Sequence, residues 1–538
     1  MAASQPFSVA LQGGLDKSSN SLELLTKPGI ATKLKNFEVS TKGGYRRING
    51  FTAFGDGTRP NSTNAIEGLH VYADGVIAAS GTNIYFSQDG DSWLQINKAS
   101  VAGGGDNFST FSGRSTLART SQTKASFVTF EGNTTYGEVV ITDEGSGVKP
   151  FYFKMTGTDA LLNSRTFFAK EITVSGTHYP KFCVIHDRHL VVAGAATALN
   201  TIFYSGTSDI DDFTSSGSGS IVLDDQVVGL KSFRNELFIF CRNSIYKLQN
   251  INDSSNIAIV PVTKNVGCVD GKTIQEFAGD LIFLAPDGFR TIAGTARIGD
   301  VELGTISKTI QPLINEIVGS NSIFEYSSVV LRDKSQYRMF YSTSSASTFN
   351  SKGIIGTLTQ RGFEWSEMAG IQAPAIASGF NSTGKEKMFH GDREGYVYNH
   401  DTGNTFNPAG ASVNIDAEYQ SPDFDYGDFG TLKTLDHVKV SLFPEGDISP
   451  TLRVRFDFDS LDRLQPDDAN IISATPSIFG DSVAIFGTSK FGSPEQPLIR
   501  SAIVGSGHSN FFKIFSSDDN APYTINGLYI NYRPAGRQ

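Results

Sequence analysis

A pair of closely spaced histidines comes nearest to metal chemistry in this chain. His186 and His189 flank Asp187 and Arg188, and two imidazoles at that spacing beside a strand turn could bind a metal ion. A structural zinc site needs four ligands, and this segment does not complete such a set. The pattern favours turn or surface histidines, and we predict that the protein binds no metal and no cofactor.

Carboxylates gather in the segment NIDAEYQSPDFDYGD, which contains Asp416, Asp423, Asp425 and Asp428. A calcium-binding EF-hand loop needs a glycine after three alternating oxygen ligands and a glutamate at its end. The segment lacks that order. Solvated turn carboxylates are therefore the favoured interpretation.

A second carboxylate pair stands on an expected strand. In TLRVRFDFDS the apolar residues Leu452, Val454, Phe456 and Phe458 alternate with Arg453, Arg455, Asp457 and Asp459. Two carboxylates on one strand face could serve a glycosidase. The arginines on the same face make a cross-strand charge ladder the better explanation.

The sequence contains no recognisable motif for a catalytic nucleophile. No G-x-S-x-G stands on a strand-to-helix turn, and the SSGSGS run at 215–220 is followed by neither Lys nor a helix. Cys183, Cys241 and Cys268 are widely spaced, and the first two stand in apolar strands, where a thiol is most often a small buried hydrophobe. We predict no disulfide, no catalytic residue and no enzymatic activity.

The elements that would position these residues follow a repeat. An apolar strand, a turn and a short aromatic strand recur with starts roughly 45 to 60 residues apart, a period typical of radially repeated sheets. The clearest copies are VIAASGTNIYFSQDG at 76–90, HLVVAGAATALNTIFYSGTSD at 189–209, ELFIFCRNSIYKLQN at 236–250, DLIFLAPDGFRTIAG at 280–294 and EKMFHGDREGYVYNHDTG at 386–403. The repeat predicts an all-β fold with a β-propeller of roughly five to seven blades, six being favoured.

Three regions differ in pattern. Residues 1–60 form an N-terminal arm with lead-in strands, residues 61–410 carry the propeller, and residues 411–538 have the longer alternating strands of a β-sandwich-like domain. One short helix is expected at 306–319, where apolar residues recur at helical spacing. Ser307 could be its N-cap, and Pro312 would stand near its first helical position.

Composition and charge fit this architecture. The chain has 538 residues with 55 Gly and 40 Phe, and its short apolar runs are bounded by turn-forming residues. A formal net charge of −10 argues against a surface dominated by nucleic-acid binding. The first residues lack the pattern of a secretory signal, and no apolar run approaches the about 20 residues that span a bilayer. We expect a soluble compartment and no membrane insertion.

One hairpin carries a recognisable turn motif. SQDGDSW at 87–93 resembles the Asp-box, a turn found on the blades of sialidases and other propellers. In that motif the carboxylate, here Asp89, accepts hydrogen bonds from turn amides, and the tryptophan, here Trp93, packs back onto the blade. We expect both residues to be structural.

The lead-in to the propeller contains two consecutive arginines. Tyr45, Arg46 and Arg47 follow the Gly43-Gly44 turn and precede Ile48-Asn49-Gly50. The arginines could form a salt-bridged turn or contact another chain. The residues alone favour the salt-bridged turn.

Three segments together resemble the tail nozzle proteins of short-tailed bacteriophages, also known as tail tubular protein B or tail-stabilisation proteins. The first is KLKNFEVSTKGGYRRINGFTAF at 33–54, where Asn49 stands at a position that is Pro in many members. The second is the run of segments from KFCVIHDRHLVVAG to ISKTIQPLI, at 181–314. The third is YTINGLYINYRPAGR at 523–537.

The resemblance implies a structural protein of the virion tail that is assembled in the host cytoplasm. Members form a ring, usually a hexamer, beneath the portal and its adaptor, and an added domain forms a distal spout or gate. For this chain it implies a homo-hexameric nozzle that conducts and retains the genome and passes double-stranded DNA without sequence-specific binding. The implied neighbours are a tail adaptor or portal-side protein and a tail fibre or needle protein. An acidic lumen would suit this role, because like charge keeps phosphates from binding.

Two other functions are open at this point. A sialidase-like tail propeller needs an arginine cluster, a nucleophile and an acid in one cleft, whereas this chain has one convincing Asp-box and no concentrated arginine set. A host-surface or glycan-binding propeller would use exposed aromatic residues of the C-terminal domain, such as Phe511, Phe512, Tyr529 and Tyr532. Core packing is the competing explanation for those four.

Overall fold

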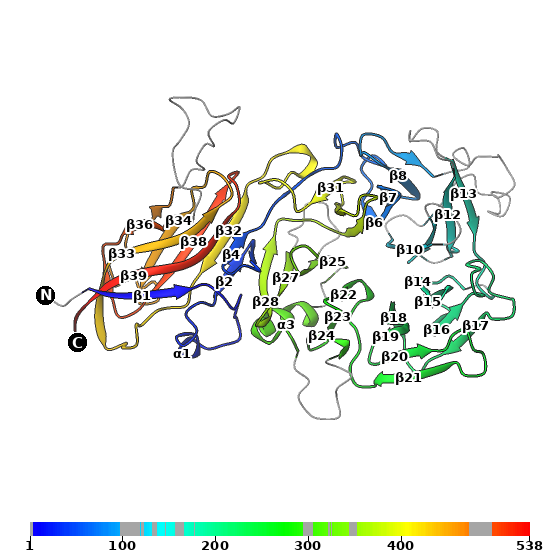
Figure 1. Ribbon diagram of the computed structural model, residues 1–538, viewed down its shortest axis with the longest axis horizontal. Coiled ribbons are helices and arrows are strands. Elements are labelled where there is room, and N and C mark those ends of the chain that lie inside the picture. The colour runs from blue at the N-terminus through cyan, green and yellow to red at the C-terminus, as the bar shows by residue number, and fades with distance from the viewer. Residues whose placement is uncertain are drawn as a thin grey trace.

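The computed structural model consists of a ring of sheets joined to a smaller β-sandwich, with both chain ends at the sandwich (Figure 1). The ring lies at the right of Figure 1 and the sandwich at the left. The structure describes residues 4–96, 119, 123–131, 137–145, 147–156, 166–176, 178–293, 305–320, 323, 325–343, 352–472 and 498–537. None of the helices in these segments is long and apolar enough to cross a membrane.

The ring is a β-propeller of antiparallel sheets that follow one another along the chain. Within the described segments it has six four-stranded blades and one three-stranded sheet, in agreement with the predicted fold. The four-stranded blades are β6–β9 (Ile66–Tyr72, Gly75–Ser80, Asn83–Ser87, Leu94–Gln95), β10–β13 (Ala125–Phe130, Glu138–Asp143, Phe151–Thr156, Thr166–Glu171), β14–β17 (Phe182–His186, His189–Ala195, Ala198–Tyr204, Gly219–Val222), β18–β21 (Val227–Phe233, Glu236–Cys241, Ile245–Gln249, Ala258–Thr263), β25–β28 (Glu325–Leu331, Gln336–Ser342, Lys352–Thr359, Gly362–Ala369) and β29–β31 with β5 (Ala375–Phe380, Glu386–Gly391, Val397–His400, Phe51–Ala53). The three-stranded sheet is β22–β24 (Gln275–Phe277, Asp280–Ala285, Gly288–Thr291), preceded by the 3-10 turn η4 (Gly271–Thr273).

Tight hairpins set the positions of the paired histidines. Asp187 and Arg188, between β14 and β15, have φ of 48° and 68°. Two consecutive residues in the left-handed region form a type I′ turn, whose twist matches that of the strands it joins. The turn sets His186 opposite His189 in the ladder. Their spacing is thus a consequence of hairpin geometry.

The N-terminal arm closes the ring. Strand β5 pairs with β31, with Thr52 opposite Asn399, and so supplies the outermost strand of the last blade. The chain then enters β6, the first strand of the next blade, which packs directly against β29. Closure therefore uses segments from both ends of the propeller sequence.

The helix expected at 306–319 is present, with a different start. Helix α3 spans Gln311–Gly319, has Pro312 in its first turn, and follows a 3-10 turn at Lys308–Ile310. The N-cap prediction for Ser307 is wrong, since its side chain makes no capping bond and its Oγ instead accepts the N–H of Phe289 at 3.0 Å. The N-terminal arm also contains the single-turn helix α1 (Ser21–Leu24).

Two sheets form the C-terminal sandwich. The first contains β1 (Gln5–Ala10), β3 (Phe37–Val39), β4 (Tyr45–Arg47), β39 (Tyr523–Arg537), β33 (Thr431–Pro444), β36 (Leu498–Ala502) and β37 (Ser506–Gly507). The second contains β2 (Lys33–Lys35), β32 (Ile415–Gln420), β38 (Asn510–Asp518), β34 (Thr451–Phe456) and β35 (Ala469–Asn470). Their apolar faces share one core, to which Val438, Val454, Ile514 and Leu528 belong.

The arm also joins the propeller to the sandwich. Strand β2 pairs in parallel with β28, the last strand of a blade, and antiparallel with β32 of the sandwich. The blade and the second sandwich sheet thereby become one nine-stranded sheet. Strands β3 and β4 extend the first sandwich sheet through the pairing of β4 with β39.

The alternating pattern of 451–460 holds only to Phe456. Leu452, Val454 and Phe456 are buried as predicted, but β34 ends there, and Asp457, Phe458 and Asp459 all have positive φ. Phe458 is 56% exposed, so its placement on the buried face is wrong. Asp457 and Asp459 consequently lie in a turn and do not form a pair on one strand face.

Candidate functional site

Asp89 lies in the turn between β8 and β9, where the sequence predicts an Asp-box. Its Oδ1 accepts the N–H of Asp91 at 3.1 Å, and Ser87 Oγ accepts the N–H of Gly90 at 2.9 Å. Asp89 is exposed, whereas Ser87 is fully buried. The serine therefore contributes at least as much to the turn as the aspartate does.

Trp93 connects this hairpin to the strand that closes the ring. Its ring packs edge-on against Phe54, with 6.1 Å between the centroids, and its Nε1 donates to Thr58 O at 2.9 Å. Asp91 Oδ1 accepts the N–H of Asp56 at 2.8 Å. The hairpin thus binds the segment that follows β5, which is a structural role.

Because Ser87 is buried and Asp89 is exposed, replacing each of them by alanine should destabilise the fold to a different extent. We expect Ser87→Ala to lower the free energy of unfolding by about 1 kcal/mol, because a buried N–H then loses its acceptor, and Asp89→Ala to lower it by about half as much. Thermal unfolding of the two variants measures the order. A larger loss for Asp89→Ala would contradict it.

Tyr45 and Arg47 are both fully buried between the propeller and the sandwich. Tyr45 Oη donates to Gly29 O at 2.8 Å, and burial raises the pKa of the phenol. Arg47 pairs with Asp518 at 3.1 Å and donates to the carbonyl oxygen of Asn520 at 2.7 Å. Neither side chain is available to another chain.

Arg46 belongs to a group of charges that we call the arm junction, comprising Glu38, Arg46, Lys334, Arg338 and Asp401, of which Glu38 and Arg338 are buried and the other three partly buried. Glu38 accepts from three cations, at 2.8 Å from Arg46, 3.0 Å from Lys334 and 2.8 Å from Arg338. Asp401 lies 2.6 Å from Lys334 and 3.1 Å from Arg338. The junction links the arm, the blade β25–β28 and the end of the last blade.

Electrostatics keep the junction carboxylates ionised. Burial alone would raise the pKa of Glu38, but Lys334 and Arg338 outweigh it and the net pKa is lowered. The same two cations lower the pKa of Asp401 against its burial. Arg46 makes a further ion pair with Glu445 of the sandwich at 2.5 Å. Both arginines are ion-paired within the chain, as the salt-bridge interpretation expects, but they lie in strand β4 and not in a turn.

Two histidines adjoin the junction. His400 Nε2 lies 3.2 Å from the Arg338 guanidinium, and His400 Nδ1 lies 3.2 Å from His390 Nδ1. An arginine can only donate, so His400 Nε2 accepts and His400 Nδ1 carries the proton that it donates to His390. Both rings are thereby held neutral. Burial lowers the pKa of His390 to about 3.

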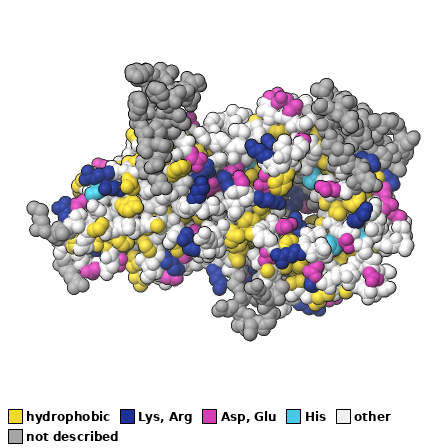
Figure 2. Space-filling view, viewed as in Figure 1, with side chains coloured by type: hydrophobic (Ala, Val, Ile, Leu, Met, Phe, Trp, Pro, Cys, Tyr) yellow, Lys and Arg dark blue, Asp and Glu magenta, His cyan; other side chains and the backbone are white. Residues whose placement is uncertain are grey.

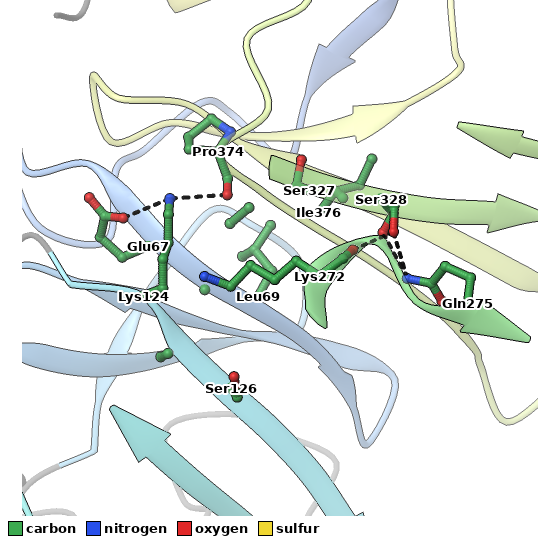
Figure 3. A pocket seen from close by; sticks show the side chains of 13 residues that line it. Glu67, Leu69, Lys124, Ser126, Lys272, Gln275, Ser327, Ser328, Pro374 and Ile376 are labelled. Carbon is green, nitrogen blue, oxygen red and sulfur yellow. Dashed lines mark hydrogen bonds and ion pairs between the residues drawn. The ribbon is translucent and has the colours of Figure 1, made fainter. Parts of the chain in front are cut away.

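A second charged cluster, which we call the hub, lies where the first strands of several blades converge. It comprises Glu67 of β6, Lys124 just before β10, Glu325 of β25 and Arg393 after β30. Lys124 Nζ lies 2.8 Å from Glu67, 2.6 Å from Glu325 and 3.1 Å from Pro374 O. Arg393 lies 2.5 Å from Glu325. One ammonium group therefore bridges several blades (Figure 3).

The hub borders a small polar cavity of about 160 Å³. Lys272 extends across it toward Lys124 (Figure 3) and pairs with Glu144 at 2.5 Å. Ligand pockets usually measure roughly 300–1,000 Å³, so this space is too small for a typical ligand. Burial would raise the pKa of Glu67, but Lys124 and then Arg393 outweigh it and lower the pKa.

The hub is better suited to holding blades together than to chemistry. The four charged side chains are at most one-tenth exposed, and every carboxylate is ion-paired. A glycosidase needs two carboxylates presented to a substrate in an open cleft. The described residues of the hub present none, and the absence of enzymatic activity stays a prediction.

The other candidate residues have structural partners. His186 Nδ1 lies 2.9 Å from Ser232 Oγ, and His189 Nδ1 lies 2.6 Å from Ser205 O. Among the described residues no group of three or more His, Cys, Asp or Glu side chains could hold a metal ion. The cysteines are free thiols, and burial raises the pKa of each to about 12.

The acidic segment 415–428 makes turns and ion pairs. Asp425 and Asp428 accept amide protons of their own turns, at 2.9 Å from Gly427 and Gly430. Asp416 pairs with Lys35 at 2.5 Å. Asp425 and Asp428 are therefore turn carboxylates, as interpreted from the sequence, whereas Asp416 lies in strand β32. Asp423 differs, because burial raises its pKa to about 6.

Sequence reasoning did not identify the hub. A weak signal was available, since Glu67 and Glu325 stand in otherwise apolar strands, IEGLHVY and EYSSVVL. A charge that must be buried needs a partner, so such positions predict ion pairs. Which cation pairs with each of these carboxylates depends on how the blades are arranged in the ring.

Comparisons with known proteins bear on the fold class alone. No protein-family model and no curated protein matches the chain. Similar solved structures include the extracellular domain of BT4673 from B. thetaiotaomicron, described once as a one-component system and once as a hybrid two-component system, with 9% identity in both cases and TM-scores of 0.36 and 0.34. Each match covers 69% of this chain, and 45% and 44% of those chains. A complex of BBS1N with ARL6DN matches at 10% identity with a TM-score of 0.25, over 63% of this chain and 78% of that one.

Proposed function

We propose that this protein is a structural component of a short-tailed phage tail. Copies of the chain form a ring, a hexamer by the family resemblance, below the portal and its adaptor. The ring conducts and retains the genome. The proposal rests on the resemblance of three segments to tail nozzle proteins, together with the way those segments are used in the fold.

The observation that carries the proposal is the position of the segment 33–54. It contains β2 to β5, which join a blade to the sandwich, build the arm junction and close the propeller ring. One of the three segments that resemble nozzle proteins is therefore the one that unites a propeller with an added domain. That union is the architecture the resemblance implies.

The hub supports a particular path for DNA. Ion pairs centred on Lys124 fill the space between the first strands of the blades, and the cavity beside them measures about 160 Å³. A duplex, which is wider than its own major groove of about 12 Å, cannot pass between side chains of different blades that are ion-paired at 2.8 and 2.6 Å. In the proposed nozzle the DNA channel therefore runs between copies of the chain, along the axis of the ring.

Electron cryo-microscopy of the purified protein at high concentration, stabilised by mild cross-linking, tests the proposal. We expect closed rings of six copies around an open channel. A stable trimer would favour a receptor-binding spike. The absence of any ring, alone or on a portal–adaptor platform, would overturn the proposed function.

A further inference from the structure

Exposed apolar side chains are concentrated in the C-terminal sandwich. Of the fourteen large hydrophobic side chains that are exposed among the described residues, ten lie between 413 and 529, namely Val413, Phe429, Phe443, Phe458, Leu461, Leu464, Ile472, Leu498, Val504 and Tyr529. This region is about a quarter of the chain. A contiguous exposed apolar surface marks an interaction site more often than a scattered one does.

Four of these residues lie in the segments that precede β33 and follow β34, and we call them the apolar knob: Phe429, Phe458, Leu461 and Leu464. The rings of Phe429 and Phe458 lie 6.3 Å apart. Leu461 is completely exposed, and Leu464 is 84% exposed. Nothing in the described part of the chain covers them.

Hydrogen bonds and an ion pair tie the backbone of the knob to the sandwich in spite of its exposure. Asp457 Oδ1 accepts the N–H groups of His508 and Ser509 at 2.7 and 3.0 Å, and Arg463 pairs with its Oδ2 at 2.9 Å. The side chain of Gln465 bonds to both N and O of Phe456, at 2.8 and 3.1 Å. Three consecutive residues with positive φ, 457–459, turn Phe458 outward. Such strained backbone persists only where the surroundings hold it, and it is frequent at binding sites.

The rim of the knob is acidic. Asp462 and Asp467 are exposed, and neither pairs with a cation within the segments that the structure describes. Asp459 is also exposed, and its partner is Arg455 at 3.3 Å. The knob therefore fits a partner surface that is apolar at its centre and basic around it.

The outer side of the first sandwich sheet is a surface of this kind, with exposed apolar residues beside basic ones. We call it the basic face, and it comprises His437, Lys439, Leu498, Arg500 and Tyr529. Lys439 stands opposite Arg500 in one ladder and opposite Tyr529 in the other. Leu498 and Tyr529 are 55% and 48% exposed. Figure 2 shows basic side chains gathered over the sandwich end of the molecule.

Two like charges on the basic face, Lys439 and Arg500, stand opposite each other and repel. Like charges directly opposite on neighbouring strands are destabilising, and Lys439 and Arg500 have no carboxylate partner in the described part of the chain. The pKa of the neighbouring His437 is lowered, first by burial and then by these two cations. An anionic partner would remove the cost. Of the four aromatic residues proposed for host contact, Tyr529 is exposed here, whereas Phe511, Phe512 and Tyr532 are buried.

One molecule cannot bring its own knob to its own basic face. Lys433 lies close to the knob, next to β37, and Lys439 lies six residues further along β33. At about 3.3 Å per residue this places the two surfaces about 20 Å apart along the strand. They can meet only between two copies.

We propose that the apolar knob of one copy docks on the basic face of the next copy. The two surfaces are complementary in charge and both present apolar residues at their centres. The contact is heterologous, so repetition of it closes into a ring when the rotation between copies permits. This inference deepens the proposed nozzle function and rests on it, because it assigns the contact between copies to the sandwich domains.

Cysteine cross-linking tests the contact. The native thiols do not interfere, because Cys241 and Cys268 are buried and Cys183 is half-buried. We expect a mixture of Leu461→Cys and Tyr529→Cys proteins to form a disulfide-linked heterodimer under mild oxidation. The matched control is Leu22→Cys, at a leucine on α1 that is 77% exposed, mixed with the same Tyr529→Cys protein. The knob pair should give about tenfold more dimer than this control, the ratio that about 1.4 kcal/mol of contact free energy produces.

A charge exchange separates a specific contact from chance collision. Asp462→Lys in the knob partner should reduce the cross-linked dimer, and Arg500→Asp in the partner that supplies the basic face should restore it. Equal yields of cross-linked dimer from the knob pair and from the Leu22→Cys control would overturn the proposed contact. A dimer yield that falls with Asp462→Lys and is not restored by Arg500→Asp would also overturn it. If microscopy shows rings while this pair does not cross-link, the inference fails and the proposed function stands. If no ring forms on any platform, both fail.

Discussion

Replacing Arg338 by Met is expected to lower the free energy of unfolding by about 3–5 kcal/mol, the range for breaking a buried ion pair on one side. Arg338 is almost completely buried and pairs with both Glu38 and Asp401. Methionine keeps much of the apolar volume and removes the charge. The loss is therefore electrostatic in origin and is not the result of a cavity.

Two carboxylates lose their main neutralising partner in this variant. Glu38 keeps Lys334 and Arg46, and Asp401 keeps only Lys334. The His400 ring also loses the donor to its Nε2. Because Asp401 directly follows β31, we expect the ladder between β31 and β5 to open first.

Thermal unfolding and hydrogen exchange measure these effects. The matched control is Arg533→Met, which removes an arginine paired with Asp436 at the surface and should cost much less, because a solvent-exposed ion pair contributes little to stability. Amide protection should fall in β5 and β31 of the Arg338 variant while the sandwich strands keep theirs. Equal losses for the two variants would show that the arm junction is not a closure device.

The repeat was enough to predict the propeller because each blade is a local unit. A hairpin such as Phe182–His186 with His189–Ala195 depends on alternation and on a two-residue turn, and both are visible in adjacent residues. The sandwich could be predicted for the same reason. The role of β5 could not, because its partner β31 lies at the other end of the propeller sequence.

The charged clusters were less accessible to prediction. Arg46 could be singled out in the sequence because it stands beside Arg47. Glu38 pairs with both Arg46 and Arg338, yet it has no local feature that links it to either arginine. Phe458 shows the opposite failure, since alternation alone predicts burial and cannot foresee a turn made by three left-handed residues. Local patterns predict strands, whereas ion pairs between distant strands depend on how the ring closes.

Acidification is expected to destabilise the fold through His390 and His400. An unfolded histidine has a pKa near 6.5, whereas burial lowers that of His390 to about 3 and, with His390 and Arg338, holds that of His400 well below its usual range. Asp401 acts in the opposite direction on His400, and Lys334 adds to Arg338. In the window between these values the unfolded chain binds protons that the folded chain does not.

The sign of the effect follows from that difference in bound protons. Stability is unaffected by the pair above about pH 6.5 and falls as the pH drops below it, and for His390 the fall continues toward about pH 3 at up to roughly 1.4 kcal/mol per pH unit. Asp423 opposes this trend, because its raised pKa of about 6 makes the folded state the better proton binder in part of the same window. The slope of the wild-type protein alone is therefore not diagnostic, and a variant must be compared with it.

His400→Gln is the informative variant. A glutamine can accept from Arg338 through its carbonyl oxygen and donate to His390 through its amide, so it preserves the hydrogen-bond chain while removing one titrating group. We expect urea unfolding between pH 4.5 and 6.5 to give a slope of stability against pH that is shallower by roughly 1.4 kcal/mol per unit.

The wild-type protein, unfolded in the same urea series, is the reference for this slope. If His400→Gln kept the full wild-type slope, His400 would already be protonated in the folded state. A protonated imidazole has no acceptor, so the hydrogen bond from Arg338 to His400 Nε2 would be absent, and this outcome would contradict the donor chain from Arg338 through His400 to His390.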